Sequence, residues 1–234
     1  MITCVCVTEG RPRFIERAIA LFTAQTWKEK ELVIMDSFHD PSVTIPSRLA
    51  PEIVYLRCPN YTQGKRLDIG MRSASGEILQ KWDDDDVYGE NFLSSVVASH
   101  QQENAVTYLR KCLIVTKDGE LRVRSGRFAG GTLTLDKKAF RAIGQVSDIP
   151  RDVDGDVFRR CANAGVTFNP RHEYFEEYTY VRHENNTWNG MMQSRPVAGD
   201  YRNGIEHVTL DEHWQSLPVY TGAKREEVIK WLQR

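Results

Sequence analysis

Four consecutive aspartates, Asp83–Asp86, stand in the segment QKWDDDDVYGENF at residues 80–92, directly after the predicted buried strand EILQKW. Adjacent carboxylates repel one another unless a positive group joins them. Mg²⁺ and Mn²⁺ bind carboxylate oxygens and leave coordination positions open for substrate phosphates. The run therefore predicts a divalent-cation site, Mn²⁺ or Mg²⁺, that a phosphorylated substrate completes.

Two other interpretations of the run are less favoured. A solvated acidic loop is common for charged runs, but this run directly follows Trp82 at the end of a predicted buried strand. A calcium-binding EF-hand loop fails on spacing. If it began at Asp83, its fifth and sixth positions would be Val87 and Tyr88, where an oxygen ligand and a glycine are needed.

The first hundred residues alternate short apolar runs with amphipathic segments. Continuous apolar runs are typical of parallel strands buried on both faces, and strand–helix alternation indicates a doubly wound parallel sheet. Cys4 and Cys6 should share one buried face of the first strand. The expected strands are 2–7, 32–35, 53–56 and 77–82, and the expected helices are 12–25 and 64–76.

Polar side chains follow several of these strands. Thr8 and Glu9 come after the first strand, Asp36 after the second and Asp83–Asp86 after the fourth. Ligands of doubly wound sheets bind outside the carboxyl ends of the strands. We therefore expect these residues to converge on one binding site.

The second half of the sequence is less regular. Residues 106–124 are predicted as a hairpin that turns at Lys117–Glu120, with Asp-Gly as the turn sequence. A strand at 132–135 should lead to Asp136 as the N-cap of a helix ending at Gly144. Two further helices are expected at 154–165 and 221–234.

Composition and charge exclude several classes of protein. Lys and Arg total 31 against 32 for Asp and Glu, so there is no overall charge that favours DNA or an anionic membrane. Neither an apolar run of membrane-spanning length nor a secretory leader is evident. The five cysteines are odd in number and form no CxxC pair, which argues against a disulfide framework or a zinc ribbon. We expect a cytoplasmic protein.

The segment GKRLDIGMRSASGEILQKWDDDDVYGENFL resembles the central signature of family 2 glycosyltransferases, in which a basic helix and a strand lead to a DXD motif. RAIALFTAQTWKEKELVIMD is similar to the first helix, the Q-T-W/Y turn and the second strand of that family, and TCVCVTEGRP is similar to its first strand. The likeness covers 2–93 nearly continuously. It implies a GT-A fold, an α/β, Rossmann-like, single domain with a mostly parallel sheet flanked by helices. Its expected limits are 1–220, with a nucleotide-sugar half at 1–100, an acceptor half at 101–220, and a C-terminal helix at 221–234.

The resemblance also implies roles on the donor side of the site. Asp83 and Asp85 would form the DXD pair, with Asp85 as the main metal ligand and Asp83 or Asp84 near the ribose and diphosphate. Asp36 would contact the nucleotide base. The family usually has D-D-G-S here and this sequence reads MDSFHD, so the nucleotide stays open and UDP-sugar is suggested by the family alone.

Further donor-side residues have competing interpretations. Thr8 and Glu9 lie in the loop after the first strand. Lys65 and Arg66 are expected to contact the diphosphate or the base, or else to form an ordinary solvated basic turn. His183, in YVRHENNTWNG, would complete the metal shell, contact the diphosphate or be structural.

The acceptor side carries the predicted base. FAGGTLTLDKKAFRAIG resembles the acceptor-side segment of the family, and RDVDGDVFRRCANAG aligns with its E-D-x-D-L-W-x-R segment. On that match Asp154 is the general base. Val153 replaces the family glutamate, so Asp152 and Asp156 remain alternatives, and Asp152 or Asp154 could instead cap the helix.

Together these features predict a metal-dependent, inverting transfer of a sugar from a nucleotide-diphosphate sugar to an acceptor hydroxyl. A sugar nucleotidyltransferase would need a glycine-rich loop after the first strand, where TEGRPR offers one glycine. A metal-dependent nuclease would need a more basic surface, and a non-catalytic nucleotide-sugar-binding module would need no base. The acceptor is not readable from the sequence, and the balanced charge makes nucleic acid the less favoured choice.

Overall fold

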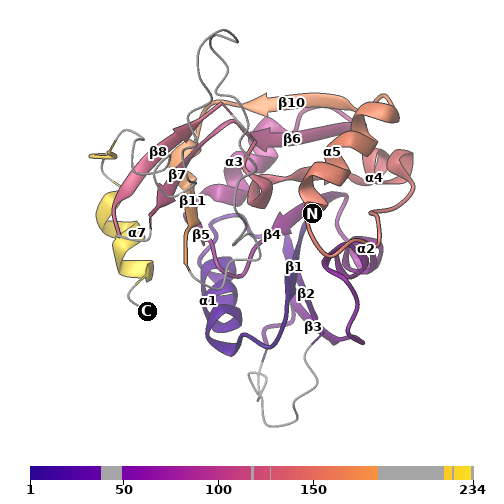
Figure 1. Cartoon of the computed structure of the whole chain (residues 1–234), viewed down its shortest axis with the longest axis horizontal. Coiled ribbons are helices and arrows are strands. Elements are labelled where there is room, and N and C mark those ends of the chain that lie inside the picture. The colour runs from indigo at the N-terminus through magenta and orange to yellow at the C-terminus, as the bar shows by residue number, and fades with distance from the viewer. Residues whose placement is uncertain (38–48, 117–118, 127, 184–218, 223, 233–234) are drawn as a thin grey trace, which may run out of the picture.

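The computed structural model describes all residues except 38–48, 117–118, 127, 184–218, 223 and 233–234 (Figure 1). Within the described part, a central sheet has the spatial order β10-β6-β9-β4-β1-β2-β3. Its strands are β1 (Ile2–Thr8), β2 (Lys30–Asp36), β3 (Ile53–Arg57), β4 (Ile78–Trp82), β6 (Ala105–Leu109), β9 (Thr134–Asp136) and β10 (Thr167–Arg171).

The central sheet is mostly parallel, as predicted. Strand β1 pairs in parallel with β2 and β4, β2 pairs in parallel with β3, and β10 pairs in parallel with β6. Strand β9 runs antiparallel to both of its neighbours, β4 and β6. This single reversed strand joins the first half of the chain to the second within one sheet.

Two helices cover opposite faces of the first strands (Figure 1). Helix α1 (Pro12–Thr23) packs on the face of β1 that carries Cys4 and Cys6. Helix α2 (Gln63–Ser73) packs on the face that carries Val5. Because neighbouring side chains of a strand point to opposite faces, β1 must be apolar throughout to be covered on both sides. The predicted burial of Cys4 and Cys6 on one face is confirmed.

The ends of two helices can be compared with the sequence-based expectation. Helix α2 begins after Thr62, whose side chain accepts a hydrogen bond from the backbone of Lys65, and it ends at Ser73 rather than at the predicted Gly76. Asp136 caps α4 through the backbone of Ala139, as predicted. The remaining helices are α3 (Phe92–Ser99), α4 (Lys137–Ile143), α5 (Val153–Asn163) and α7 (Arg225–Leu232), with 3₁₀ turns η1 (Gly130–Thr132) and η2 (Phe175–Glu177).

A smaller sheet corrects the predicted hairpin at 106–124. Residues 105–109 form β6 of the central sheet, and the chain changes sheet at Arg110. The hairpin is formed by β7 and β8 alone, and Lys117 and Asp118 of its predicted turn lie outside the described residues. Apolar residues continue from β6 into β7, so the hydrophobic pattern does not mark the change of sheet. The small sheet has the order β5 (Val87–Tyr88), β11 (Tyr178–Val181), β7 (Lys111–Val115) and β8 (Leu121–Ser125).

Two further features concern the chain as a whole. None of the helices in the described ranges has the length and apolar character needed to cross a membrane. All five cysteines are free and buried.

Candidate active site

The predicted site residues converge where β1, β2 and β4 end. Thr8 lies opposite Asp36 in the pairing of β1 with β2, and Cys6 lies opposite Trp82 in the pairing of β1 with β4. The aspartates that follow Trp82 therefore reach the same edge as Thr8 and Asp36. This is the arrangement expected for the ligand-binding edge of a doubly wound sheet.

Asp84 is buried and tied to the loop after β1. The hydroxyl of Thr8 donates a hydrogen bond to Asp84 Oδ2 over 2.6 Å, and Arg11 forms an ion pair with Asp84 Oδ1. Burial and the neighbouring charge of Asp85 raise the pKa of Asp84 to about 7, and Arg11 and Thr8 limit the rise. Asp84 thus holds the first loop against the end of β4.

Asp85 faces three cationic or potentially cationic side chains. Arg11 Nη1 lies 3.1 Å from Asp85 Oδ2, and His183 Nε2 lies 3.2 Å from the same oxygen. Arg17 donates a hydrogen bond of 2.6 Å to the backbone carbonyl of Asp85. Burial alone would raise the pKa of Asp85, but the hydrogen bond with His183 and the charge of Arg11 lower it. Asp85 is therefore the carboxylate of the run that is best kept ionised.

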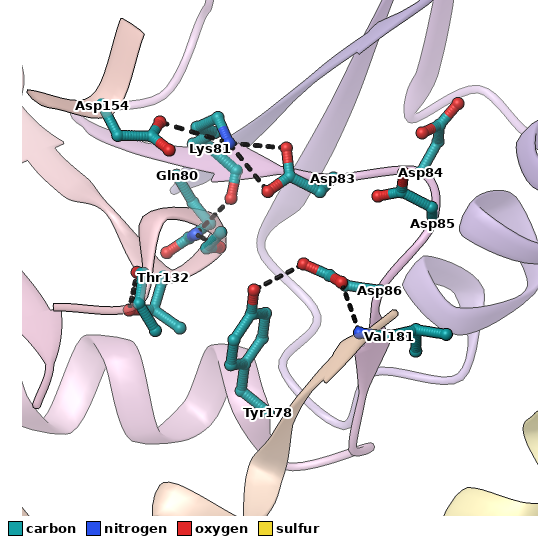
Figure 2. A network of polar contacts seen from close by, with 12 residues as sticks. Gln80, Lys81, Asp83, Asp84, Asp85, Asp86, Thr132, Asp154, Tyr178 and Val181 are labelled. Atoms are coloured by element: carbon teal, nitrogen blue, oxygen red, sulfur yellow. Dashed lines mark hydrogen bonds and ion pairs between the residues drawn. The ribbon is translucent and has the colours of Figure 1, made fainter. Parts of the chain in front are cut away.

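Asp86 serves the fold rather than the open part of the site. Tyr178 donates its hydroxyl hydrogen to Asp86 Oδ2 over 2.5 Å, and the backbone N–H of Val181 donates to Oδ1 over 3.0 Å (Figure 2). Burial, followed by the charges of Asp85 and Asp83, raises the pKa of Asp86 well above its ordinary value. Through these contacts Asp86 fastens the aspartate segment to strand β11 of the small sheet.

Asp83 and the predicted base Asp154 share a cation. The ammonium group of Lys81 lies 2.6 and 2.7 Å from the two carboxylate oxygens of Asp83, and 3.2 Å from Oδ1 of Asp154 (Figure 2). Burial of Lys81 opposes its positive charge, but the two aspartates outweigh burial and raise its pKa above the ordinary value. The structure thus places Asp154, from α5, beside the first aspartate after β4.

A pair of glycines leaves room for these carboxylates. A Cβ atom on Gly130 would lie 2.0 Å from Oδ2 of Asp154. A Cβ atom on Gly131 would lie 2.8 Å from Oδ2 of Asp83 and 2.5 Å from the hydroxyl oxygen of Tyr178. Since real Cβ atoms do not come so close to other atoms, the turn η1 can approach both aspartates only because it has no side chains there.

The other candidate bases point to different partners. Asp152 has a side chain that is 68% exposed and pairs with Arg159 at 3.1 Å. Asp156 accepts hydrogen bonds from the backbone of Ser147 and from Arg160. Neither Asp152 nor Asp154 caps helix α5: the helix begins at Val153, and Asp152, with φ 56°, makes no side-chain cap hydrogen bond. The capping interpretation of these aspartates is therefore wrong.

The remaining donor-side residues surround the end of β2. Asp36 is buried and accepts hydrogen bonds from the backbone N–H of Gly10, over 3.0 Å, and from the hydroxyl of Tyr55. Phe38–Asp40 of the MDSFHD segment, where the base-binding loop is predicted, lie outside the described residues. Asp36 joins the loop after β1 to β3.

Arg66 and Lys65 differ although they are neighbours in α2. Arg66 is buried, contacts the carbonyl oxygen of Thr8, donates to Ser37 Oγ over 2.7 Å and lies 3.6 Å from Glu9. A solvated basic turn does not describe Arg66. Lys65 is half-buried, and its backbone N–H donates to the N-cap of the helix.

Comparison with known proteins identifies the family. Residues 3–146 match the model of glycosyl transferase family 2, which is more than half of the chain. The chain belongs to this family. The predicted resemblance is thereby confirmed.

Solved structures of other glycosyltransferases share the fold of this family 2 chain. TarS of S. aureus in complex with UDP-GlcNAc matches with a TM-score of 0.62 and 13% identity, over 79% of this chain and 59% of that chain. A mannosyltransferase of Pyrobaculum calidifontis in complex with GDP-Man and Mn²⁺ matches with a TM-score of 0.55 and 14% identity, over 77% of this chain and 56% of that chain. These likenesses confirm the predicted GT-A fold. A search of curated proteins gave no match.

The family 2 chain is shorter than the solved chains that it matches. It spans 36% of a longer TarS structure and 60% of the TarS structure with UDP. The fold and the family are therefore shared, and the activity of the whole protein is a matter for proposal.

A divalent cation fits one pair of side chains at this edge of the sheet. Among the residues that the structure describes, three or more His, Cys, Asp or Glu side chains do not gather into a metal-binding group. Asp85 Oδ2 and His183 Nε2, however, lie 3.2 Å apart. Adjacent ligands of an octahedral ion with bonds of about 2.1 Å lie roughly 3 Å apart, so the pair matches two positions of such an ion. Asp83, the third predicted ligand, is instead placed on Lys81.

Sequence reasoning missed several residues of the family 2 site. Arg11 and Arg17 were not singled out, because arginines at the start of an amphipathic helix are usually solvated. Lys81 was not singled out, although its strand also carries Ile78, Leu79 and Trp82. A lysine in a strand predicted to be buried on both faces was the available indication, since buried lysines are rare unless paired. Tyr178 gave no comparable indication.

Proposed function

We propose that this chain transfers a sugar, with inversion, from a nucleotide-diphosphate sugar to an acceptor hydroxyl, with Asp154 as the general base. The observation that carries the proposal is the approach of Asp154, from helix α5, to the aspartate segment through Lys81. A donor bound at the strand ends and an acceptor bound against α5 would then meet between Asp83 and Asp154. Family membership supports the reaction class.

The donor side is proposed to bind diphosphate and metal. Asp85 and His183 would hold Mn²⁺ or Mg²⁺, and the ion would neutralise negative charge that develops on the leaving diphosphate. Of the two matching structures, one is a complex with UDP-GlcNAc and the other a complex with GDP-Man and Mn²⁺. Both ligands contain a nucleoside diphosphate, which is the part we assign to this edge of the sheet. We propose UDP as the nucleotide on family resemblance.

The remaining donor-side residues are assigned by position. Asp83 and Asp84 would lie near the ribose and diphosphate, and Asp36 near the nucleotide base. Thr8 and Arg66 hold the loop after β1 in place, since both bond within the protein. The side chain of Glu9 is 63% exposed and lies 3.6 Å from Arg66. Lys65 lies in the first turn of α2. We propose that Glu9 and Lys65 line the nucleotide site.

The chemistry requires a carboxylate on the acceptor side. Asp154 would accept the proton of the acceptor hydroxyl as its oxygen bonds to the anomeric carbon. The bond between that carbon and the diphosphate oxygen breaks on the opposite face, so the configuration inverts without a glycosyl-enzyme intermediate. The partial exposure of the Asp154 side chain, 28%, leaves it accessible to an acceptor.

Asp154 and Asp156 in helix α5, and Asp152 directly before it, provide matched variants. Asp154→Asn should lower sugar transfer about a thousandfold, to a residual rate that can still be measured, while UDP with Mn²⁺ still raises the melting temperature. Asp152→Asn and Asp156→Asn should keep most of the turnover, since these carboxylates pair with Arg159 and Arg160. Turnover is measured as UDP released from a UDP-sugar, with water or a panel of sugars as acceptor. Full turnover in Asp154→Asn would refute the assignment of the base.

The substrates consumed and the products released separate the alternatives. A sugar nucleotidyltransferase would form a nucleotide sugar from a nucleoside triphosphate and a sugar phosphate, with release of pyrophosphate. A binding module would be stabilised by the nucleotide sugar and would release no UDP. Asp154 near the donor edge favours a catalyst over such a module. We propose the cytoplasm as its compartment, in keeping with five free, buried cysteines.

A further inference from the structure

Lys81 is a buried lysine at the penultimate position of strand β4. It lies in β4 between Gln80 and Trp82 and is 5% exposed. A buried ammonium group is costly unless carboxylates pair with it, and replacing a buried ion pair by apolar residues is often neutral or stabilising. Its presence here needs a reason beyond the stability of the sheet.

The contacts of Lys81 supply that reason. Its Nζ atom lies within 2.7 Å of both carboxylate oxygens of Asp83 and 3.2 Å from Oδ1 of Asp154. Oδ1 of Asp154 is buried and has no hydrogen-bond partner among the described residues, so Lys81 is the charge that holds it there. Oδ2 of Asp154 lies against Gly130. Lys81 thereby joins β4 of the donor side to α5 of the acceptor side (Figure 2).

We propose that Lys81 is a positioning residue of the transfer reaction, which holds the base Asp154 at a fixed place relative to the donor-site carboxylate Asp83. This inference rests on the proposed roles of Asp83 and Asp154. Without the ammonium group two neighbouring carboxylates repel each other, and Asp154, the more exposed of the pair, turns away from the reacting centre. The loss of geometry then appears in turnover rather than in donor binding.

The contact itself is tested by thermal unfolding, which needs no activity. Lys81→Met should lower the melting temperature by at least about 4 °C, because it leaves two carboxylates without their shared cation. Asp154→Asn should lower the melting temperature of the wild type and raise that of Lys81→Met, since it removes the repulsion that the lysine had balanced. This reversal of sign is the expected result.

Lys30 provides a matched control. Lys30 is also buried and is the first residue of strand β2 in the same sheet. Its ammonium group, however, donates to the backbone carbonyls of Thr23 and Gln25. Asp154→Asn should therefore lower the melting temperature of Lys30→Met as it does that of the wild type. If Asp154→Asn lowered the melting temperature of Lys81→Met as well as that of the wild type, the proposed link would be overturned.

The positioning role is tested by kinetics of UDP release from a UDP-sugar with Mn²⁺. Lys81→Met should lower kcat at least about tenfold and change the KM for the donor less than about threefold. The double variant with Asp154→Asn should be no slower than Asp154→Asn alone, because residues that act as a unit are not additive. Lys81→Arg, which keeps the charge, should recover part of kcat.

The outcomes separate this inference from the proposed function. If the melting temperatures show the reversal but the two kinetic losses multiply in the double variant, Lys81 is structural and the positioning role is refuted. If the wild type releases no UDP and is not stabilised by any nucleoside diphosphate with metal, the proposed function falls and the positioning role falls with it. The melting temperatures still report the contact in that case.

Discussion

His183 places its Nε2 atom 3.2 Å from Oδ2 of Asp85, although the two residues are 98 positions apart in the chain. The imidazole ring stacks on Phe14 of helix α1, with 5.1 Å between ring centroids. The stacking fixes the plane of the ring, and the hydrogen bond fixes which nitrogen faces the carboxylate. A nitrogen and an oxygen are thus held ready at the spacing of two neighbouring metal ligands.

Removal of either proposed metal ligand, Asp85 or His183, should weaken metal-dependent nucleotide binding. In the wild type, UDP should raise the melting temperature with Mn²⁺ and not with EDTA, because a ligand that binds the native state stabilises it by mass action. Asp85→Ala should lose the Mn²⁺-dependent shift, and His183→Ala should weaken Mn²⁺ binding roughly tenfold. Glu103→Ala, which changes an exposed carboxylate, serves as the control. An undiminished Mn²⁺-dependent shift in Asp85→Ala would exclude that residue as the ligand.

Arg11 should compete with the metal when no nucleotide is bound. Its guanidinium group pairs with Asp84 and Asp85 and so neutralises the charge that would attract a cation. Arg11→Met should increase the affinity for Mn²⁺ severalfold, as measured by electron paramagnetic resonance of the free ion, and should lower the melting temperature in EDTA. Arg13→Met, which changes an exposed arginine of α1, should alter neither quantity. Weaker Mn²⁺ binding in Arg11→Met would show that Arg11 assists the ion instead.

The contribution of Asp84 to the stability of the metal-free protein should fall as the pH rises toward 7. Burial and Asp85 raise the pKa of Asp84 from 3.8 to about 7. Between these values the folded state holds a proton that the unfolded state has released, so the free energy of unfolding falls by up to about 1.4 kcal/mol per pH unit. Above the folded pKa the contribution is constant. Asp84→Asn should therefore flatten the decline between about pH 4 and pH 7.

This pH dependence is measured as the difference between wild type and Asp84→Asn in urea unfolding with EDTA. Contributions of titrating groups that do not interact with Asp84, such as His100, whose pKa is lowered by burial, cancel in the difference. Saturating Mn²⁺ should reduce the difference, because a cation favours the ionised carboxylates. Equal slopes for the two proteins in EDTA would contradict the raised pKa.

Tyr178 should contribute more to stability than an exposed tyrosine. Its hydroxyl donates to Oδ2 of Asp86, which is buried and cannot turn to water. Tyr178→Phe should lower the free energy of unfolding by about 1–3 kcal/mol, the cost of an unsatisfied buried acceptor. Tyr174→Phe removes a hydroxyl from a residue that is 50% exposed and should change it by less than about 0.5 kcal/mol. Urea unfolding measures both, and equal effects would contradict the role assigned to Tyr178.

The sequence predicts the strand ends well because apolar runs of parallel strands are continuous and the polar residues after them are conspicuous. It therefore indicates the shared edge of Thr8, Asp36 and the aspartates. It does not separate the four aspartates from one another. Their roles depend on partners that are distant in the chain, such as Tyr178 for Asp86.

The sequence pattern also does not predict the direction of strand β9 or the change of sheet at Arg110. Strand β9 has three residues and lies antiparallel between β4 and β6, and no local pattern fixes the direction of so short a strand. The sheet change at Arg110 is equally unmarked. In both places tertiary pairing, rather than local preference, decides the structure.

Strand β9 also determines how the chain can be divided. A chain cut after residue 100 would lack β9 and would leave the N–H and C=O groups of β4 open along one side. Exposed strand edges of this kind pair with other copies and promote aggregation. The two expected halves, 1–100 for the nucleotide sugar and 101–220 for the acceptor, should therefore fold as one cooperative unit, and a chain shortened to 1–100 should be recovered mainly as insoluble material.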